Sequence, residues 1–419
     1  MTPNKSIRYV GDALYCDDVA VSAIIADVGT PTYIYSLPRI LDNLARIKQA
    51  FAGLDAHIHY SAKANANLTV LRTLIEAGVG VDVVSGGEMF KALHAGTHGR
   101  DIVFAGVGKR PDEIRYALEN GVGWFNVENV AECRTIDTIA ASIGVHDVQI
   151  ALRFNPQVTA QTHPYIATGH GGAKFGLTAD VITDILTHQT DYPNLRFAGI
   201  HVHIGSQLHN VGATRQAIEK VCQLAQPYPN VTTINIGGGL PVAYQQQSEL
   251  PDWQSFADAL QPLLAGYQVI LEPGRSIVAD AGILVTELLY VKEQAGQVFY
   301  IVDASMTELM RPALYQAHHM VVPLHTGQAE QRLVQLVGPV CETTDVLAKD
   351  ITLPVAQVGD YFAMLTSGAY GMVMANTYNA RPRPAEVAVH TDGVHWSTVR
   401  KRETLQDLIM AELDAIQLE

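Results

Sequence analysis

The sequence has few charged residues and no long apolar run. Charged residues make up 17% and hydrophobic residues 48% of the chain, a balance that predicts a well-buried globular protein rather than a disordered one. Its apolar stretches all end before the ~20 residues that a membrane-spanning helix needs. The N-terminal segment Met1–Ser6 lacks the apolar core of a secretion signal. We therefore expect a cytoplasmic protein with no membrane span.

Basic residues and cysteines are also scarce. The chain has 28 Lys and Arg against 42 Asp and Glu, a formal net charge of −14, and no basic stripe, which argues against nucleic acid as a partner. The cysteines are Cys16, Cys133, Cys222 and Cys341. They are widely spaced and form no C-x-x-C pair, so we expect neither a metal site nor a disulfide framework.

What the chain has in abundance is an alternation of short β-branched runs with longer segments of helical periodicity. A length of 419 residues favours two domains. Helical spacing is clear in Leu68–Ala77 and Pro111–Leu118. Eight strands, each followed by a helix, predict a (β/α)₈ barrel over residues 30–276. The strands are His57–Ser61, Gly80–Val84, Ile102–Ala105, Gly123–Val127, Gln149–Phe154, Ala198–His203, Thr232–Ile236 and Gln268–Leu271.

After Arg275 the pattern changes to runs typical of antiparallel strands, with Asp392-Gly393 as a hairpin turn. We expect a second, mostly β domain made of residues 277–419 together with residues 1–29. The predicted strands are Gly282–Lys292, Gln297–Asp303, Arg332–Val340, Asp350–Leu365 and Glu386–Val399.

Polar residues stand at the carboxyl ends of the predicted barrel strands, where barrels of this kind place their chemistry. Because these ends share one face of a barrel, we expect the residues to lie together. They are Lys63 after the first strand, Asp82 and Ser85 at the second, His203 and Ser206 at the sixth, Gly237–Gly239 after the seventh, and Glu272, Gly274 and Arg275 after the eighth.

A lysine and a glycine-rich turn among these residues indicate a phosphorylated carbonyl cofactor. Lys63 can condense with a carbonyl to a Schiff base, although most lysines at strand ends are only solvated. The backbone N–H groups of Gly237–Gly239 can close on a phosphate, although a lone GGG is often only a tight turn. Together with Arg275 they predict pyridoxal 5′-phosphate (PLP). Glu272 is then the candidate to hold a proton on the pyridine nitrogen, and His203 to stack on the ring.

Motifs along nearly the whole chain carry a resemblance to a known family. They are YSAKAN at 60–65, DVVSGGE at 82–88, HPYIATG at 163–169, KFGL at 174–177, HVHIGSQ at 201–207, INIGGG at 234–239, EPGR at 272–275, MRPALY at 310–315, GPVCETTDVLA at 338–348, GAYG at 368–371 and YNARPRPAEV at 378–387. With these motifs the chain resembles the fold-type III PLP-dependent decarboxylases, and among them those acting on meso-2,6-diaminopimelate. The resemblance implies release of carbon dioxide and L-lysine, the last step of lysine biosynthesis.

The resemblance also implies roles for individual residues. Lys63, Cys341 and His203 would be catalytic, with Lys63 holding PLP and Cys341 protonating the carbanion after carbon dioxide leaves. A free cysteine is more often a buried small hydrophobe. The cofactor-binding residues would be Lys63, Asp82, His203, Ser206, Gly237, Gly238, Gly239, Glu272, Gly274, Arg275 and Tyr370.

A substrate with charges of both signs at its distal end is implied by the remaining matches. Arg275, Arg311 and Tyr315 would face the distal carboxylate and Glu342 the distal ammonium, with Tyr370 closing on the substrate. Arg311 and Tyr315 can also simply begin a helix after Met310. In the family, the Cys341 and Glu342 side chains come from the partner subunit, so the resemblance implies a homodimer with shared active sites.

Other assignments remain open. Decarboxylases of carboxynorspermidine, of ornithine or lysine, and of arginine share much of the scaffold. An alanine-racemase-like isomerase shares the barrel, the lysine and the cofactor, but needs a second base opposite Lys63. A non-catalytic relative that binds a partner protein would tend to lack Lys63 or Cys341, and both are present.

Overall fold

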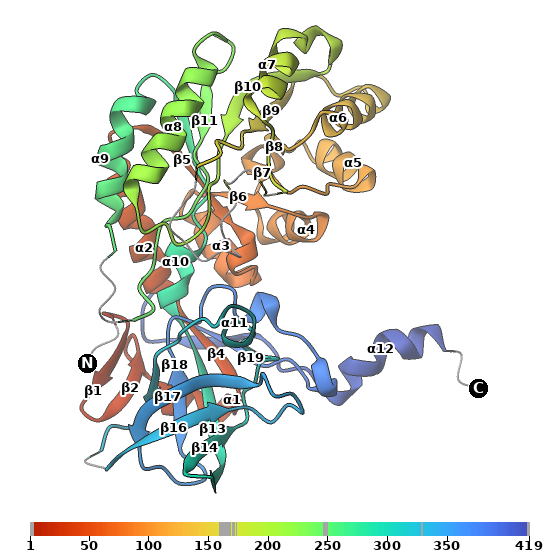
Figure 1. The fold of residues 1–419 in the computed structure, drawn as a ribbon. Coiled ribbons are helices and arrows are strands. Elements are labelled where there is room, and N and C mark those ends of the chain that lie inside the picture. The colour runs from red at the N-terminus through yellow and green to blue at the C-terminus, as the bar shows by residue number, and fades with distance from the viewer. Residues whose placement is uncertain are drawn as a thin grey trace. The chain divides into compact units, whose positions relative to one another are not determined.

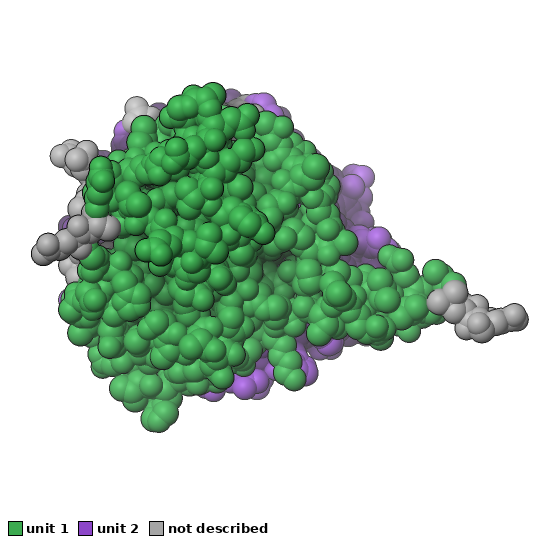
Figure 2. All heavy atoms as spheres, turned by 90° about the horizontal axis from the view of Figure 1, so that it is seen from below, with its two compact units in different colours: residues 1–42, 243–248, 277–419 green, residues 43–242, 249–276 purple. Residues whose placement is uncertain are grey.

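The computed structural model describes residues 4–158, 169, 172, 174–245, 250–327 and 330–416. The motif at 163–169, apart from Gly169, lies outside these residues. The chain forms two compact units (Figure 2). Unit 1 contains residues 1–42, 243–248 and 277–419, and unit 2 contains residues 43–242 and 249–276. Among the described residues, no helix has both the length and the apolar character to cross a bilayer.

Unit 2 contains a closed barrel of eight parallel strands, with helices around it (Figure 1). Each predicted strand overlaps one of them, so the (β/α)₈ barrel is confirmed. The strands are β5 (Asp55–Ser61), β6 (Gly80–Val83), β7 (Ile102–Phe104), β8 (Trp124–Val127), β9 (Val148–Arg153), β10 (Leu195–His201), β11 (Thr233–Asn235) and β12 (Gln268–Leu271). The helices are α3 (Leu68–Glu76), α4 (Gly86–Ala95), α5 (Pro111–Glu119), α6 (Val130–Ile143), α7 (Ala179–Thr187), α8 (Val211–Ala225) and α9 (Trp253–Leu264), and α2 (Leu37–Ala50) precedes β5.

An apolar layer fills the interior of this barrel. Side chains from five strands pack together there, all of them buried: Val103, Trp124, Ala151, Ala198 and Ile270. Such a cluster requires inward-pointing side chains, because β7, β8, β9, β10 and β12 surround the barrel axis. The polar residues at the strand ends therefore stand on a packed apolar support.

The helices that follow β6 and β8 begin with side-chain caps. Ser85 accepts a hydrogen bond from the backbone N–H of Glu88 (3.2 Å), and the Glu88 carboxylate accepts one from the backbone N–H of Val84 (2.9 Å). Asn129 caps α6 in the same way through the N–H of Glu132 (2.8 Å). Reciprocal capping of this kind fixes where a helix starts. It therefore fixes the direction in which the preceding strand ends.

Unit 1 contains the mostly antiparallel sheet that the sequence predicted, with strand order β17-β16-β14-β13-β4-β19-β20. In addition, β18 pairs with β13, and β15 pairs with β18. Parallel pairing occurs between β4 and β19 and between β14 and β16. The strands are β4 (Thr32–Ser36), β13 (Gly282–Gln294), β14 (Gln297–Val302), β15 (Val321–Pro323), β16 (Gln331–Val337), β17 (Val346–Pro354), β18 (Tyr361–Met364), β19 (Ala385–Val389) and β20 (Trp396–Arg400).

Smaller elements complete unit 1. A three-stranded sheet is made of β1 (Ile7–Val10), β2 (Ala13–Cys16) and β3 (Val19–Ala20), and the helices are α1 (Val21–Val28), α10 (Arg275–Val278, beginning in unit 2), α11 (Arg311–Tyr315) and α12 (Leu405–Ala415). The prediction of one strand over Asp350–Leu365 was wrong. The chain turns between β17 and β18, where Gly359 has a φ of 92°, a left-handed conformation that glycine adopts readily.

Candidate active site

The predicted cofactor residues of the barrel come together at the carboxyl ends of its strands. Lys63 lies in the turn that follows β5, Asp82 lies in β6, and His203 and Ser206 follow β10. Gly237–Gly239 follow β11, and Glu272, Gly274 and Arg275 follow β12. Ser61 links three of these strand ends directly. Its hydroxyl, at the end of β5, lies 2.7 Å from Asp82 Oδ2 in β6 and 2.9 Å from the backbone carbonyl of Glu272 after β12. One face of the barrel therefore holds the set, as predicted.

The Lys63 amine is accessible and lies next to the buried carboxyl group of Asp82. Its Nζ lies 3.2 Å from Asp82 Oδ2, and the exposed fraction is 39% for the Lys63 side chain but 0% for that of Asp82. Burial raises the pKa of Asp82, and the Glu272 charge raises it further, although Lys63 acts in the opposite direction. A carboxylate with a raised pKa beside an amine can take up the proton that the amine must lose to act as a nucleophile.

Glu272 is a buried carboxylate with three polar neighbours. Its Oε1 accepts hydrogen bonds from Asn126 Nδ2 (2.8 Å) and Asn235 Nδ2 (2.6 Å), and its Oε2 lies 3.4 Å from His201 Nε2. Burial alone would raise the pKa of Glu272, but His201, Lys63 and the Asn235 amide outweigh burial and hold the pKa below its ordinary range. Glu272 is therefore ionised near neutral pH and can accept a hydrogen bond from a protonated ring nitrogen.

His203 is neutral and lies against the glycine turn. The backbone N–H of Gly238 donates to His203 Nδ1 at 3.3 Å, so the ring proton is on Nε2. Burial, which disfavours the charged ring, holds the pKa of His203 well below its ordinary value, and the positive charges of Arg153 and Lys63 lower this pKa further. An uncharged imidazole offers a flat face on which an aromatic ring can stack.

The turn at Gly237–Gly239 has room only for glycine. Gly237 has a φ of 66°, and a Cβ there would lie 2.8 Å from His203 Nδ1. A Cβ on Gly238 would lie 2.4 Å from the carbonyl oxygen of Glu272. Glycine is therefore required for this turn to pack against His203 and the end of β12, and glycine-rich turns of this kind are common phosphate-binding sites. In the same unit, Arg275 Nε donates to Ser206 Oγ at 3.2 Å, which supplies a cation and a hydroxyl suited to a phosphate, so these residues fit PLP.

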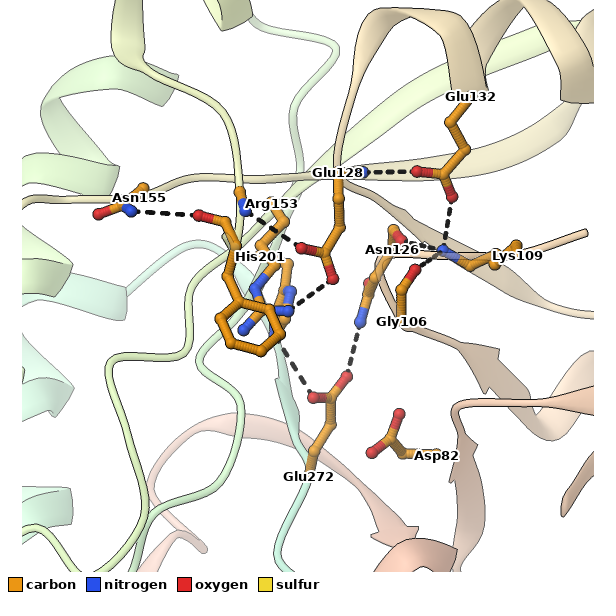
Figure 3. Close-up of polar contacts among 12 residues, drawn as sticks. Asp82, Gly106, Lys109, Asn126, Glu128, Glu132, Arg153, Asn155, His201 and Glu272 are labelled. Atoms are coloured by element: carbon orange, nitrogen blue, oxygen red, sulfur yellow. Dashed lines mark hydrogen bonds and ion pairs between the residues drawn. The ribbon is translucent and has the colours of Figure 1, made fainter. Parts of the chain in front are cut away.

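The sequence reasoning missed a buried ionic network behind this set (Figure 3). The Lys109 side chain is 1% exposed, and its Nζ donates to Glu132 Oε1 (2.5 Å), to the Asn126 carbonyl (2.7 Å) and to the Gly106 carbonyl (2.9 Å). Glu132 Oε2 accepts from the backbone N–H of Glu128 (2.8 Å). The only signal in the sequence is the occurrence of charged residues just after apolar strands.

The network continues from Glu128 to the next strand end. The Glu128 carboxylate accepts from Arg153 Nη1 at 2.6 Å through one oxygen and from the Gly176 N–H at 3.1 Å through the other. The Arg153 guanidinium lies 4.6 Å from the ring centroid of Phe175. The KFGL motif at 174–177 is thus tied to β9, and the charges that stand behind the cofactor residues are paired.

The other predicted residues, Arg311, Tyr315, Cys341, Glu342 and Tyr370, belong to unit 1. Arg311 does begin α11, as the simpler alternative held. Cys341 is exposed, so the alternative that it is a buried hydrophobe is wrong. Tyr370 has a φ of 55°, which is uncommon outside glycine. A joint site of these residues with the cofactor residues of unit 2 stays a prediction.

Arg311 contacts two aromatic side chains. It is buried, its Nη1 lies 2.7 Å from His319 Nε2, and its guanidinium lies 4.5 Å from the ring centroid of Tyr244. His319 Nδ1 lies 2.9 Å from the Leu365 carbonyl, so Nδ1 carries the proton and Nε2 accepts from Arg311. The guanidinium is therefore held in one orientation.

Residues 37–279 match the family model of the pyridoxal-dependent decarboxylases, pyridoxal binding domain. The chain belongs to the pyridoxal-dependent decarboxylase family. The cofactor of this family is PLP, the group that the turn at Gly237–Gly239 and the pair Lys63–Asp82 fit.

Similarity to individual members of the family extends over nearly the whole chain. A diaminopimelate decarboxylase of Aquifex aeolicus is 39% identical over 417 residues and is covered to 98%, as is this chain. The crystal structure of a diaminopimelate decarboxylase from M. jannaschii in complex with L-lysine has a TM-score of 0.92, with 33% identity and 99% of each chain covered. A Vibrio vulnificus lysine/ornithine decarboxylase complexed with cadaverine is more distant, with a TM-score of 0.79, 25% identity, and coverage of 88% of this chain and 97% of that one.

Proposed function

We propose that this protein decarboxylates meso-2,6-diaminopimelate to L-lysine and carbon dioxide with PLP as its cofactor. The observation that carries the proposal is the convergence of Lys63, Asp82, Glu272 and the glycine turn on one barrel face, in a chain that aligns with diaminopimelate decarboxylases over 98% of its length. The weaker similarity to the lysine/ornithine enzyme favours diaminopimelate over a diamine precursor.

The residues of the barrel have separate tasks in this proposal. PLP, when bound, supplies an electron-withdrawing ring that stabilises the electron pair left on the α-carbon when carbon dioxide departs. Glu272 holds a proton at the pyridine nitrogen, and His203 covers one face of the ring. Gly237–Gly239, with Ser206, Gly274 and Arg275, bind the phosphate. Asp82 would accept the proton that the Lys63 amine loses before it bonds to the cofactor.

The substrate-binding residues would be Arg275, Arg311, Tyr315, Glu342 and Tyr370. Arg311 supports this assignment because it is buried and held by neutral His319, with Tyr244 stacked on it. The distal carboxylate of diaminopimelate would bind this fixed, planar guanidinium, and ornithine and lysine lack such a carboxylate.

We propose a cytoplasmic homodimer in which Cys341 and Glu342 act in the active site of the partner subunit. The exposure of Cys341 supports a role at a subunit surface, since a thiol of purely structural use is normally buried. The four cysteines are free, as expected in a reducing compartment. Tyr370, with its left-handed backbone, would close on the cofactor and substrate.

A substrate comparison tests the reaction directly. Purified protein with PLP is supplied with meso-diaminopimelate, ornithine, arginine, L-lysine or carboxynorspermidine, and both carbon dioxide and the amine product are measured. We expect L-lysine and carbon dioxide in equal amounts from meso-diaminopimelate, with a kcat/KM far above that for the other substrates. Epimerisation without carbon dioxide would instead indicate a racemase, and preference for ornithine or carboxynorspermidine would replace the proposed substrate.

Replacing Cys341 with alanine should slow turnover by roughly 10²- to 10⁴-fold, the contribution of a positioned general acid. The visible absorbance of bound PLP should remain, because the cofactor residues are in the barrel. Cys222→Ala is the matched control, since Cys222 is a free thiol that contacts the Leu263 carbonyl (3.3 Å) in unit 2. An unchanged rate for Cys341→Ala would remove its catalytic role.

Mixing two inactive variants tests whether the active sites are shared. If Cys341 acts in the site of the partner subunit, a mixed dimer of Lys63→Ala and Cys341→Ala subunits has one intact site. Random re-association of equal amounts should then restore about a quarter of wild-type activity. No recovery, although mixed dimers are demonstrated by differently tagged subunits, would contradict a shared site.

A further inference from the structure

Two amide side chains converge on one oxygen of Glu272. Asn126 lies in β8 and Asn235 lies in β11, next to β12, which Glu272 follows. In the order of the closed barrel, β8 stands four strands away from β12, directly across the interior. Both asparagines are 0% exposed. Oε1 of Glu272 is therefore held from two directions, and the carboxylate cannot rotate without breaking a hydrogen bond.

Each asparagine is held in place by its own surroundings. Asn235 Oδ1 accepts from the backbone N–H of Gly237 at 2.9 Å, so its Nδ2 faces Glu272. The backbone carbonyl of Asn126 accepts from Lys109 Nζ at 2.7 Å, and Lys109 is anchored by Glu132 (2.5 Å). The glycine turn and the buried ion pair thus each hold an asparagine that donates to the same carboxylate oxygen. Figure 3 shows the contacts of Asn126 with Lys109 and Glu272.

The hydrogen bond from Asn126 to Glu272 leaves the other end of the Asn126 amide unsatisfied. Its Oδ1 is buried and has no hydrogen-bond partner among the described residues, which is unfavourable for an amide oxygen. A residue selected only for packing would not leave that oxygen unsatisfied. The gain is on the Nδ2 side, where donation to a carboxylate stabilises the charged form of Glu272.

We infer that Asn126 and Asn235 are positioning residues that keep Glu272 ionised and direct its Oε2 toward the ring nitrogen of PLP. With Oε1 occupied by two donors, Oε2 is the oxygen that remains, and it lies 3.4 Å from His201 Nε2. The inference rests on the proposed function, because it concerns the carboxylate that would face the pyridine nitrogen.

The test uses Asn126→Leu, which keeps the volume but removes the donor, in a double-mutant cycle with Glu272→Gln. The first readout is the pKa of Glu272 in the full-length protein without PLP, measured by NMR of ¹³C-labelled glutamate side chains and assigned with Glu272→Gln. We expect Asn126→Leu to raise this pKa. We also expect PLP affinity and kcat to fall about 10- to 100-fold, the effect of one hydrogen bond to a charged group, with KM little changed.

The cycle separates positioning from a structural effect. If Asn126 acts through Glu272, its replacement should change PLP affinity and kcat little in the Glu272→Gln background. Asn194→Leu is the matched control, because Asn194 is a buried amide bonded to Asp137 (3.1 Å) before β10 begins, and it should leave the pKa of Glu272 unchanged. Asn126→Ser, measured in parallel, provides the comparison if the leucine variant fails to fold.

An unchanged pKa of Glu272, or an equal loss of PLP affinity in both backgrounds, would overturn the inference. These two readouts do not require turnover. If the wild-type protein fails to decarboxylate meso-diaminopimelate, the proposed function falls, while the pKa and PLP titrations still decide the role of the asparagines.

Discussion

Replacing Lys63 with alanine should reduce turnover by more than ~10²-fold, the lower end of what a positioned acid or base contributes, and should abolish the covalent attachment of PLP. Lys63 is the accessible amine beside the buried Asp82 carboxylate (3.2 Å), and alanine has no nitrogen with which to bond the cofactor covalently. The measurement is kcat with meso-diaminopimelate together with the visible spectrum of the purified variant. Phosphate-binding residues remain, so weak non-covalent PLP binding should persist.

The matched control is Lys48→Ala. Lys48 lies in α2 and donates to the Ala77 carbonyl at 2.7 Å, so its replacement removes an exposed lysine that has no link to the strand ends. It should retain the spectrum and the rate of the wild-type protein. Turnover by Lys63→Ala within a few-fold of wild type would contradict the assignment of the nucleophile.

The second large effect is expected from Arg311→Ala. If Arg311 binds the distal carboxylate of the substrate, kcat/KM for meso-diaminopimelate should fall by two to four decades, corresponding to roughly 3 to 5 kcal/mol for a buried charge that loses its partner. Discrimination against L-lysine as a substrate should shrink by a similar factor, because lysine lacks that carboxylate. Steady-state kinetics with both substrates measure these changes.

Two variants make the Arg311 result interpretable. Arg311→Lys keeps the charge but not the planar fork that contacts His319 and Tyr244, so it should give an intermediate loss. Arg332→Ala removes an arginine of β16, in unit 1, that pairs with Glu293 of β13, and it should leave kcat/KM unchanged. Near-wild-type kinetics for Arg311→Ala would refute a role in substrate binding.

The barrel and the residues at the ends of its strands could be predicted from the sequence, because both follow from patterns within short stretches of the chain. Strand runs and helical spacing repeat within short windows, and the carboxyl end of each strand is a position in the sequence. Lys63, Glu272 and the turn at Gly237–Gly239 were predicted on that basis, and the structure places them on one face. Turn chemistry likewise identified the hairpin at Asp392-Gly393 between β19 and β20.

The polar support behind these residues could not be predicted in this way. The bond between Asn126 and Glu272 joins residues 146 positions apart. The bond from Lys109 to Glu132 joins the segment after β7 to the first turn of α6. Neither leaves a periodic signal, because each depends on how the barrel closes. β4 was missed as well, since TYIYS is a short run with a fully buried pattern whose partners β13 and β19 lie far along the chain.

Borohydride trapping followed by peptide mapping tests the central claim most directly. The protein is saturated with PLP, treated with borohydride, digested and examined by mass spectrometry. We predict that the visible absorbance is bleached and that a single peptide, the one containing Lys63, carries the reduced cofactor. Labelling of a different lysine, or a protein that gains no borohydride-sensitive absorbance with PLP, would contradict the account.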